Sequence, residues 1–195
     1  MTLASVLALL AAFQAGGQTP PGPPPGMPAP TAGMPAQPPG VPLPPADELS
    51  LAAATEWAEA AIAACAANGY HVTASYMNTE LDTKLVMRAD AAMERTVDVA
   101  RRKAYTVIKT GMTSGQYGLS VGFKPGMRPT MVPGQPWGLP PGPNADQNMI
   151  VLAGGLPVKV RGKIIGAVSV SGAPGGEKDE ACAEAGLAKI ADKLR

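Results

Sequence analysis

The chain has 195 residues, among them 23 glycines, 22 prolines and one histidine, and its formal net charge at pH 7 is +1. This near-neutral charge argues against a dedicated nucleic-acid-binding protein, which needs a clustered basic surface. With His71 as its sole imidazole, one chain cannot form a multi-histidine zinc or di-iron site, and a triad hydrolase could use only that residue.

The N-terminus begins with an apolar run over residues 3–15. This run is shorter than the roughly 20 residues of a membrane-spanning helix and matches the apolar part of a secretory signal peptide. No lysine or arginine precedes it, but cleavage after Gly17 would place small residues at the cut. We therefore expect a signal peptide over residues 1–17, export to the periplasm or the extracellular space, and no transmembrane span. An apolar tail that is not a signal is the alternative.

Residues 18–47 are rich in proline and glycine, and no charged residue occurs before Asp47. Proline lacks the amide donor and fixes φ, so this stretch can form neither a helix nor a central strand. Glycine does not recur at every third position, which excludes a collagen helix. We expect a disordered, polyproline-like tether that separates the N-terminus from a folded domain.

The remaining residues, 48–195, have the size of one domain. Ser50 is a suitable N-cap for the first helix, and Gly69 a suitable residue just beyond its end. In chain order, the apolar periodicity predicts a helix over 51–68, strands over 71–78 and 84–88, a helix over 94–110, strands over 148–153, 157–160 and 164–171, and a helix over 178–194. This order predicts an α+β domain in which an antiparallel β-sheet is flanked by helices.

A long irregular stretch, residues 112–147, interrupts these elements and is rich in glycine and proline. Loops of this length within a compact domain are usually binding loops or lids, or else disordered insertions. We therefore expect the functional residues in or beside this stretch.

The segment from Gly154 to Leu187 reads GGLPVKVRGKIIGAVSVSGAPGGEKDEACAEAGL. It resembles the GlcG/HbpS-type haem-binding family, which has a GG-x-P-V strand, a short hairpin, a strand ending in V-S-G and a helix of the D-E-x-C-A-x-A-G-L type. Leu49–Ala53, Arg88–Ala92 and Arg101–Thr106 fit earlier segments of that family. The resemblance covers residues 48–195, although residues 122–147 are longer and richer in proline than the family's usual connection.

The resemblance implies a profilin-like layered domain, assembly into homo-oligomers, and binding of haem or a related tetrapyrrole. Iron in haem is commonly held by imidazole, thioether, thiolate or phenolate groups. The candidates are His71, Met112 and Tyr117, with Thr113 as a weak hydroxyl ligand or a holder of water. Met127 and Met131 are further thioethers of the same loop, and methionines also simply fill gaps.

Cations that could bind the haem propionates lie on the second predicted helix. Arg102 and Lys109 are the candidates, and the alternative is that both belong to a solvated helix face. Asp90, Glu94 and Asp98 recur every four residues, so Glu94 and Asp98 are candidate ligands for iron if the helix begins early. A surface network of ion pairs is the alternative interpretation of these carboxylates.

Cys65 and Cys182 fall within the first and last predicted helices, where they could form a disulfide in an exported protein or remain unpaired and buried. No pair of a nucleophile and a base can be assigned. Together, the apolar N-terminal run and the family resemblance predict an exported haem-binding protein that is not an enzyme, or at most degrades haem weakly. The alternatives are a corrinoid- or small-metabolite-binding accessory domain of the PduO/GlcG type, and a structural oligomer that has lost its ligand.

Overall fold

The computed structural model describes residues 47–129, 131 and 133–194. The expected signal peptide and almost all of the expected tether lie outside these residues. In chain order the elements are α1 (Leu51–Ala66), β1 (Thr73–Met77), β2 (Thr83–Arg88), α2 (Thr96–Thr110), α3 (Ser114–Ser120), β3 (Gly155–Val160), β4 (Lys163–Ser171), α4 (Gly176–Lys189) and the 3₁₀ helix η2 (Ala191–Leu194). No helix within the described ranges is both long and apolar enough to cross a membrane.

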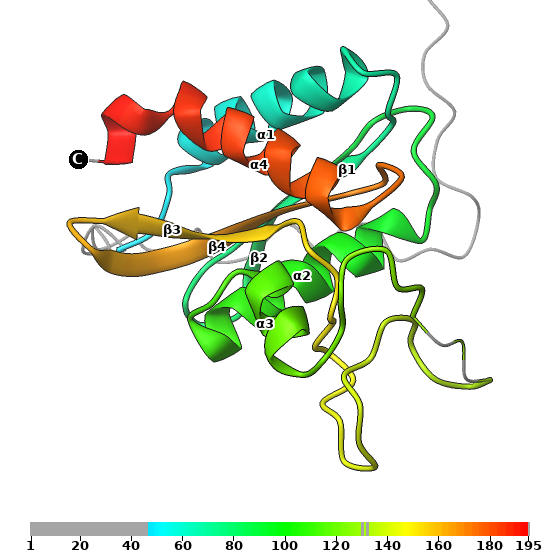
Figure 1. Cartoon of the computed structure of the whole chain (residues 1–195). Helices are drawn as coiled ribbons and strands as arrows, with labels where there is room; N and C mark the ends of the chain where they lie inside the picture. The colour runs from blue at the N-terminus through cyan, green and yellow to red at the C-terminus, as the bar shows by residue number, and fades with distance from the viewer. Residues whose placement is uncertain (1–46, 130, 132, 195) are drawn as a thin grey trace, which may run out of the picture. The chain divides into compact units, whose positions relative to one another are not determined.

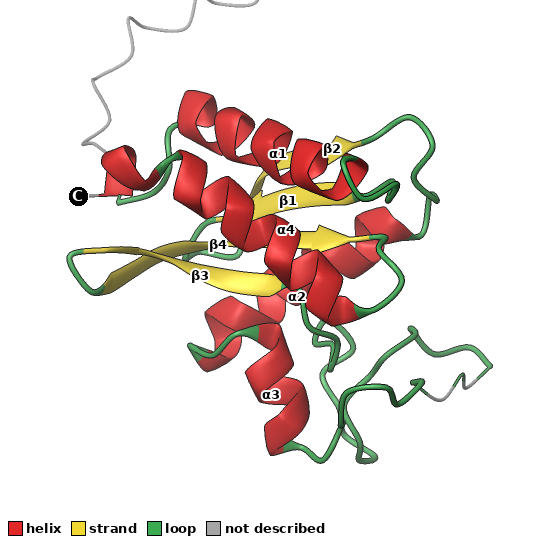
Figure 2. Ribbon diagram, turned by 45° about the horizontal axis from the view of Figure 1, so that its top comes forward, coloured by secondary structure: helices red, strands yellow, loops and turns green. Residues whose placement is uncertain are grey.

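The four strands form one antiparallel sheet in the order β2-β1-β4-β3. Helices α1 and α4 lie side by side on one face of the sheet, and α2 and α3 lie on the other (Figures 1 and 2). This three-layer arrangement confirms the α+β domain with an antiparallel sheet flanked by helices.

The two faces of the sheet differ in chemistry. Ala74 and Tyr76 of β1 point into the apolar core beneath α1 and α4, together with Val168 and Val170 of β4. The opposite face carries buried hydroxyls, two of which bind α2 directly. The Thr73 hydroxyl lies 2.7 Å from that of Thr96, and Ser169 Oγ donates to the carbonyl of Ala100 at 2.6 Å.

Helices α1 and α4 are joined by a disulfide between Cys65 and Cys182, whose Cα atoms are 5.5 Å apart. Beside it, the indole of Trp57 is fully buried and donates to the carbonyl of Ala183 at 3.1 Å. A Cβ on Gly186 would lie 2.7 Å from that indole ring. The absence of a side chain at position 186 therefore allows the two helices to pack closely. Of the two alternatives for the cysteines, the structure shows the paired one.

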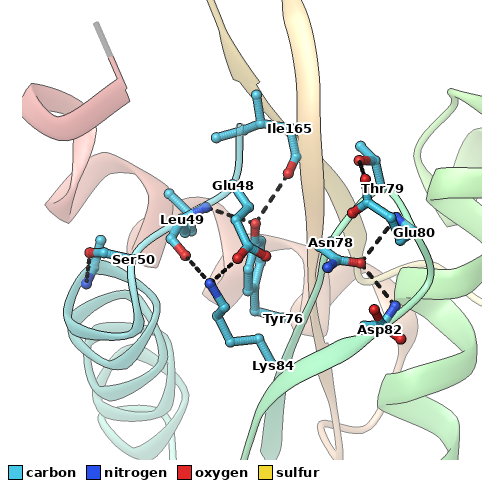
Figure 3. A network of polar contacts seen from close by, with 11 residues as sticks. Glu48, Leu49, Ser50, Tyr76, Asn78, Thr79, Glu80, Asp82, Lys84 and Ile165 are labelled. Atoms are coloured by element: carbon cyan, nitrogen blue, oxygen red, sulfur yellow. Dashed lines mark hydrogen bonds and ion pairs between the residues drawn. The ribbon is translucent and has the colours of Figure 1, made fainter. Parts of the chain in front are cut away.

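The segment that enters α1 is held by a buried polar network around Tyr76 (Figure 3). The Tyr76 hydroxyl accepts the backbone N–H of Leu49 at 2.8 Å and donates to the carbonyl of Ile165 at 3.1 Å. Lys84 donates to the carbonyl of Leu49 at 3.0 Å and pairs with Glu48. Burial raises the pKa of Tyr76 to about 12.

Two predicted elements differ from the structure. The stretch beginning at residue 112 contains a helix, α3, which the sequence prediction left irregular. Residues 148–153 were expected to form a strand, and that prediction is wrong. Their backbone bonds to other partners: the N–H of Ile150 donates to the Thr106 hydroxyl, and the N–H of Val151 to the carbonyl of Gly138.

Candidate functional site

The loop between α3 and β3 packs beside the start of α4 and leaves three adjacent pockets. A large pocket of about 560 Å³ lies between this loop, the start of α2 and the turn before α4. An acidic pocket of about 360 Å³ lies between α3 and α4. A proline-lined pocket of about 360 Å³ lies within the loop itself. Phe123 lines all three pockets and therefore stands at their junction.

The large pocket combines apolar walls with two unpaired cations. Its apolar side chains include Met93, Val99, Phe123, Met127, Trp137 and Leu152. Of its three cations, Lys103 is paired with Asp179, whereas Arg95 and Arg128 have no ion-pair partner among the described residues. Met93 is 51% exposed, Met127 52% and Trp137 37%. Exposed apolar side chains grouped around a concave surface are a usual feature of a ligand site.

A buried ion pair lies at the base of the large pocket. Lys103 Nζ is 2.7 Å from Asp179 Oδ2 and donates to the carbonyl of Val170 at 2.8 Å. Asp179 also accepts the backbone N–H of Ala173 at 2.9 Å. Burial raises the pKa of Asp179, while the Lys103 ammonium and the backbone donors act in the opposite direction. The pair ties α2, the end of β4 and the start of α4 together, so the base of the pocket is rigid.

Glycine at position 154 makes this ion pair possible. A Cβ there would lie 2.7 Å from Lys103 Nζ and 2.7 Å from the Cβ of Asp179. Gly154 also has a φ of +118°, which side-chain-bearing residues rarely adopt. The Gly-Gly pair at 154–155, which carries part of the family resemblance, thus leaves room for the two charged side chains.

The acidic pocket has the opposite charge. Thr113 and Gln116 at the start of α3 face Glu177, Glu180 and Glu184 of α4 across it. Burial raises the pKa of Glu180, and the neighbouring carboxylate of Glu184 raises it further. An anionic group would be repelled in this pocket. No group of three or more His, Cys, Asp or Glu side chains in the described part of the chain could hold a metal ion.

Neither of the two predicted propionate-binding cations is among the described residues that line the large pocket. Arg102 is buried, and its guanidinium donates to the carbonyls of Trp137 and Met149, at 2.6 Å each. It therefore holds the long loop against α2, and the expectation of a solvated helix face is wrong for this residue. Lys109 is exposed on the last turn of α2.

The predicted iron ligands are dispersed. His71 is exposed just before β1, and Met112 is half-buried between α2 and α3. Thr113 lines the acidic pocket, where its hydroxyl caps α3 by accepting the N–H of Gln116 at 3.1 Å. Tyr117 is half-buried on α3, where burial raises its pKa, with a smaller contribution from Asp146. The structure does not bring these residues into one site.

The predicted carboxylate ladder does not form within a helix. Helix α2 begins at Thr96, so Asp90 and Glu94 precede it. Glu94 is exposed, and Asp98 lies 3.6 Å from Arg101 and 3.8 Å from Arg102. This geometry corresponds to the alternative interpretation, a surface network of ion pairs.

The lining of the large pocket includes residues that the sequence analysis did not name as candidates. They are Met93, Arg95, Lys103, Phe123, Arg128 and Trp137. One signal pointed to Lys103: it follows Ala100 by three residues and therefore shares the buried face of α2. For Phe123, Arg128 and Trp137 the signal was their position in the long loop where function was expected.

Comparison with known proteins places the chain in a family. Residues 49–188 match the family described as haem degrading protein HbpS-like, and the chain belongs to that family. A relative from Citrobacter freundii, an uncharacterized 15.0 kDa protein in the dhaT-dhaS intergenic region, is 32% identical over 139 residues. The match covers 71% of this chain and 89% of that relative.

Solved structures agree with this assignment. The Klebsiella pneumoniae protein ORFY matches with a TM-score of 0.60 and 27% identity, over 73% of this chain and 90% of that one. HbpS matches with a TM-score of 0.59 and 29% identity, over 76% of this chain and 94% of HbpS. A PduOC:haem complex matches with a TM-score of 0.55 over 73% of this chain and 95% of that one, and its 18% identity shows a shared fold alone.

Proposed function

We propose that this protein binds haem in the large pocket and handles it outside the cytoplasm without a catalytic cycle of its own. The observation that carries the proposal is the large pocket itself: an open hollow with apolar walls and two unpaired cations, in a chain of the HbpS-like family. The printed name of the family and the haem bound in the PduOC complex support the choice of ligand.

The residues of the large pocket fit a haem group. Phe123, Trp137 and Leu152 supply apolar surface for a flat macrocycle. Arg95 and Arg128 supply guanidinium groups, which bind carboxylates such as the propionates in a bidentate manner. Haem, when bound, would supply an iron centre that takes axial ligands and changes oxidation state.

Charge distinguishes the large pocket from its neighbour. The described lining of the acidic pocket has three glutamates and no arginine or lysine, whereas the large pocket sets two unpaired arginines against one unpaired carboxylate, Glu177, which both pockets share. A dianionic ligand therefore gains attraction in the large pocket and meets repulsion in the acidic one. Within the large pocket, Lys103 and Asp179 neutralise each other, so this pair adds rigidity more than net charge.

Export is part of the same proposal. The apolar N-terminal run has the length of a signal peptide's apolar region. The Cys65–Cys182 disulfide supports an oxidising compartment, because such bonds are rare in reducing cytosol. Mass spectrometry of the protein recovered from the host's extracytoplasmic fraction tests it: we expect a mature N-terminus after Gly17, and an intact N-terminus recovered from the cytosol would contradict export.

Haemin titration of the full chain tests the ligand. We expect a saturable shift of the Soret band. The double variant Arg95→Gln/Arg128→Gln should bind at least tenfold more weakly, since two charge-assisted contacts contribute on the order of 1–3 kcal/mol. Arg161→Gln, at the exposed tip of the β3–β4 hairpin, is the matched control and should bind as the wild type does. A wild type that shows no saturable shift, but is stabilised by a corrinoid, would support the accessory-domain alternative instead.

A further inference from the structure

The large pocket offers few side chains that can bind iron. The usual axial donors are imidazole, thiolate, phenolate and thioether groups. Among the described residues of its lining there is no histidine, cysteine or tyrosine. Both cysteines are consumed in the disulfide between α1 and α4. The thioethers of Met93 and Met127 are the two members of these donor classes that remain.

We propose that Met93 and Met127 are the iron-binding residues of this pocket and that they make the protein selective for ferrous haem. This inference rests on the proposed function and adds to it the ligand atoms and the oxidation state of the preferred ligand.

Both sulfur-bearing side chains are available in the structure. Met93 and Met127 are half-exposed on the surface of the pocket, whereas Met77 is fully buried in the core between β1 and α2. Because neither Met93 nor Met127 belongs to the core, either side chain can turn toward a ligand without loss of core packing. Their exposure without a ligand leaves apolar surface in water, which is a cost that a bound macrocycle would remove.

Met127 is also positioned by its own turn. Its backbone N–H donates to the carbonyl of Lys124 at 3.1 Å, and its sulfur accepts the N–H of Lys124 at 3.1 Å. These two bonds close the turn over residues 124–127 and fix the direction of the side chain. A thioether sulfur has a second lone pair, which remains for a metal ion.

The oxygen donors of the lining are less suited to this role. Asp179 is held by Lys103, and the Thr96 hydroxyl lies 2.7 Å from that of Thr73 and donates to the carbonyl of Met93. Ser171 offers only a neutral hydroxyl, so Glu177, which lines both the large and the acidic pocket, is the remaining carboxylate. A carboxylate is a hard donor that favours ferric iron, whereas a thioether is soft and favours ferrous iron. The oxidation state of the haem that binds more tightly therefore distinguishes a carboxylate ligand from a thioether ligand.

The proposal has a measurable electrochemical consequence. If the reduced haem binds more tightly than the oxidised haem, the reduction potential of the bound haem rises in proportion. Each tenfold preference for the reduced state corresponds to 59 mV for a one-electron couple. Thioether ligation is known to raise haem potentials in this way.

The test is a redox titration of the full-length chain with bound haemin, together with binding titrations of ferric and dithionite-reduced haem. We expect the wild type to bind reduced haem at least tenfold more tightly. Met93→Leu/Met127→Leu should lose that preference, lowering the potential by 59 mV or more, with little change in ferric affinity. Leucine conserves volume and apolar character, so the variant should fold as the wild type does.

Met131→Leu is the matched control, because Met131 is 81% exposed on the same loop and is absent from the described lining of the large pocket. It should leave the potential unchanged. Haem that binds with the same potential in the double variant would overturn the thioether proposal while leaving the proposed function in place. A potential that moves in Glu177→Gln instead would also overturn it. A wild type that fails to bind haem would overturn the proposed function itself.

Discussion

Single polar side chains inside this domain decide how its segments meet. The Tyr76 hydroxyl connects the entry to α1 with β4 and is fully shielded from water. Lys103 does the same between α2, β4 and α4. Losing either one would leave buried donors or acceptors without partners, which is more costly than losing apolar contact area of the same size.

The Tyr76→Phe variant tests the first of these contacts. Removing the hydroxyl leaves the Leu49 N–H and the Ile165 carbonyl without this partner, so we expect the free energy of unfolding to fall by about 1–3 kcal/mol. Urea denaturation measures it. Tyr70→Phe is the control: the Tyr70 ring lies under the Lys178 ammonium, 5.2 Å from its centroid, and this contact survives the change. Equal stabilities of the two variants would contradict the role given to the Tyr76 hydroxyl.

The same residue predicts a dependence on alkaline pH. Burial raises the pKa of Tyr76 from the ordinary value of 10.0 to about 12 in the folded chain. The folded state keeps the phenol proton where the unfolded state has lost it, so the stabilisation is complete below pH 10 and disappears as the pH rises to about 12. A difference of two between the folded and unfolded pKa values corresponds to a loss of about 2–3 kcal/mol in the free energy of unfolding.

Unfolding experiments between pH 9 and 12 measure this dependence as the difference in the free energy of unfolding between the wild type and Tyr76→Phe. We expect that difference to shrink as the pH rises, because only the wild type carries the Tyr76 proton. A difference that stays constant across the range would show that Tyr76 titrates alike in both states.

At the scale of elements, the sequence predicted most helices and strands but missed α3 and misassigned 148–153. The signature of α3 was present: Thr113 and Gln116 form a capping box three residues apart. Gly115 and Gly118 hid the helix, because glycine is a poor helix former. Their small size is needed for packing, since a Cβ on Gly118 would overlap with the carbonyl oxygen of Val151. Tertiary contact thus outweighs local propensity in α3.

The two helices of the other layer depend on their disulfide. Cys65 and Cys182 are 117 residues apart in the sequence, so the bond closes a long loop in the unfolded chain. We expect reduction to lower the free energy of unfolding by about 3–5 kcal/mol. Denaturation with and without a thiol reductant measures the effect. The double variant Cys65→Ala/Cys182→Ala should be insensitive to reductant, and a wild type equally insensitive would contradict a formed disulfide.

At the scale of the whole molecule, the fold was predictable and the site was not. The motifs around Gly154–Leu187 carry the fold, because they encode strand pairing and tight packing within one continuous segment. The large pocket instead combines α2, the long loop and the turn before α4, which are far apart in sequence. Arg102 illustrates the difference: the sequence predicted either a propionate-binding cation or a solvated helix face, and the loop that covers it could not be placed from the sequence.

Asp47 and the large pocket lie at opposite ends of β4. Asp47, the first described residue, pairs with Lys163 at the start of this nine-residue strand, and Ser171 at its end lines the pocket. Eight steps of about 3.3 Å separate the two ends by roughly 26 Å. Because the described lining of the pocket comes entirely from residues 93–179, we expect a chain lacking residues 1–46 to bind haemin within about twofold of the full chain. A tenfold loss in a Soret titration would show that the N-terminal residues contribute to the site.

The central claim is that haem occupies the large pocket, and a crystal structure of the full chain grown with haemin tests it most directly. The account predicts the macrocycle against Phe123 and Trp137, propionates toward Arg95 and Arg128, and iron within bonding distance of the Met93 or Met127 sulfur. A macrocycle bound in the acidic pocket between α3 and α4, or iron ligated by His71, would contradict it.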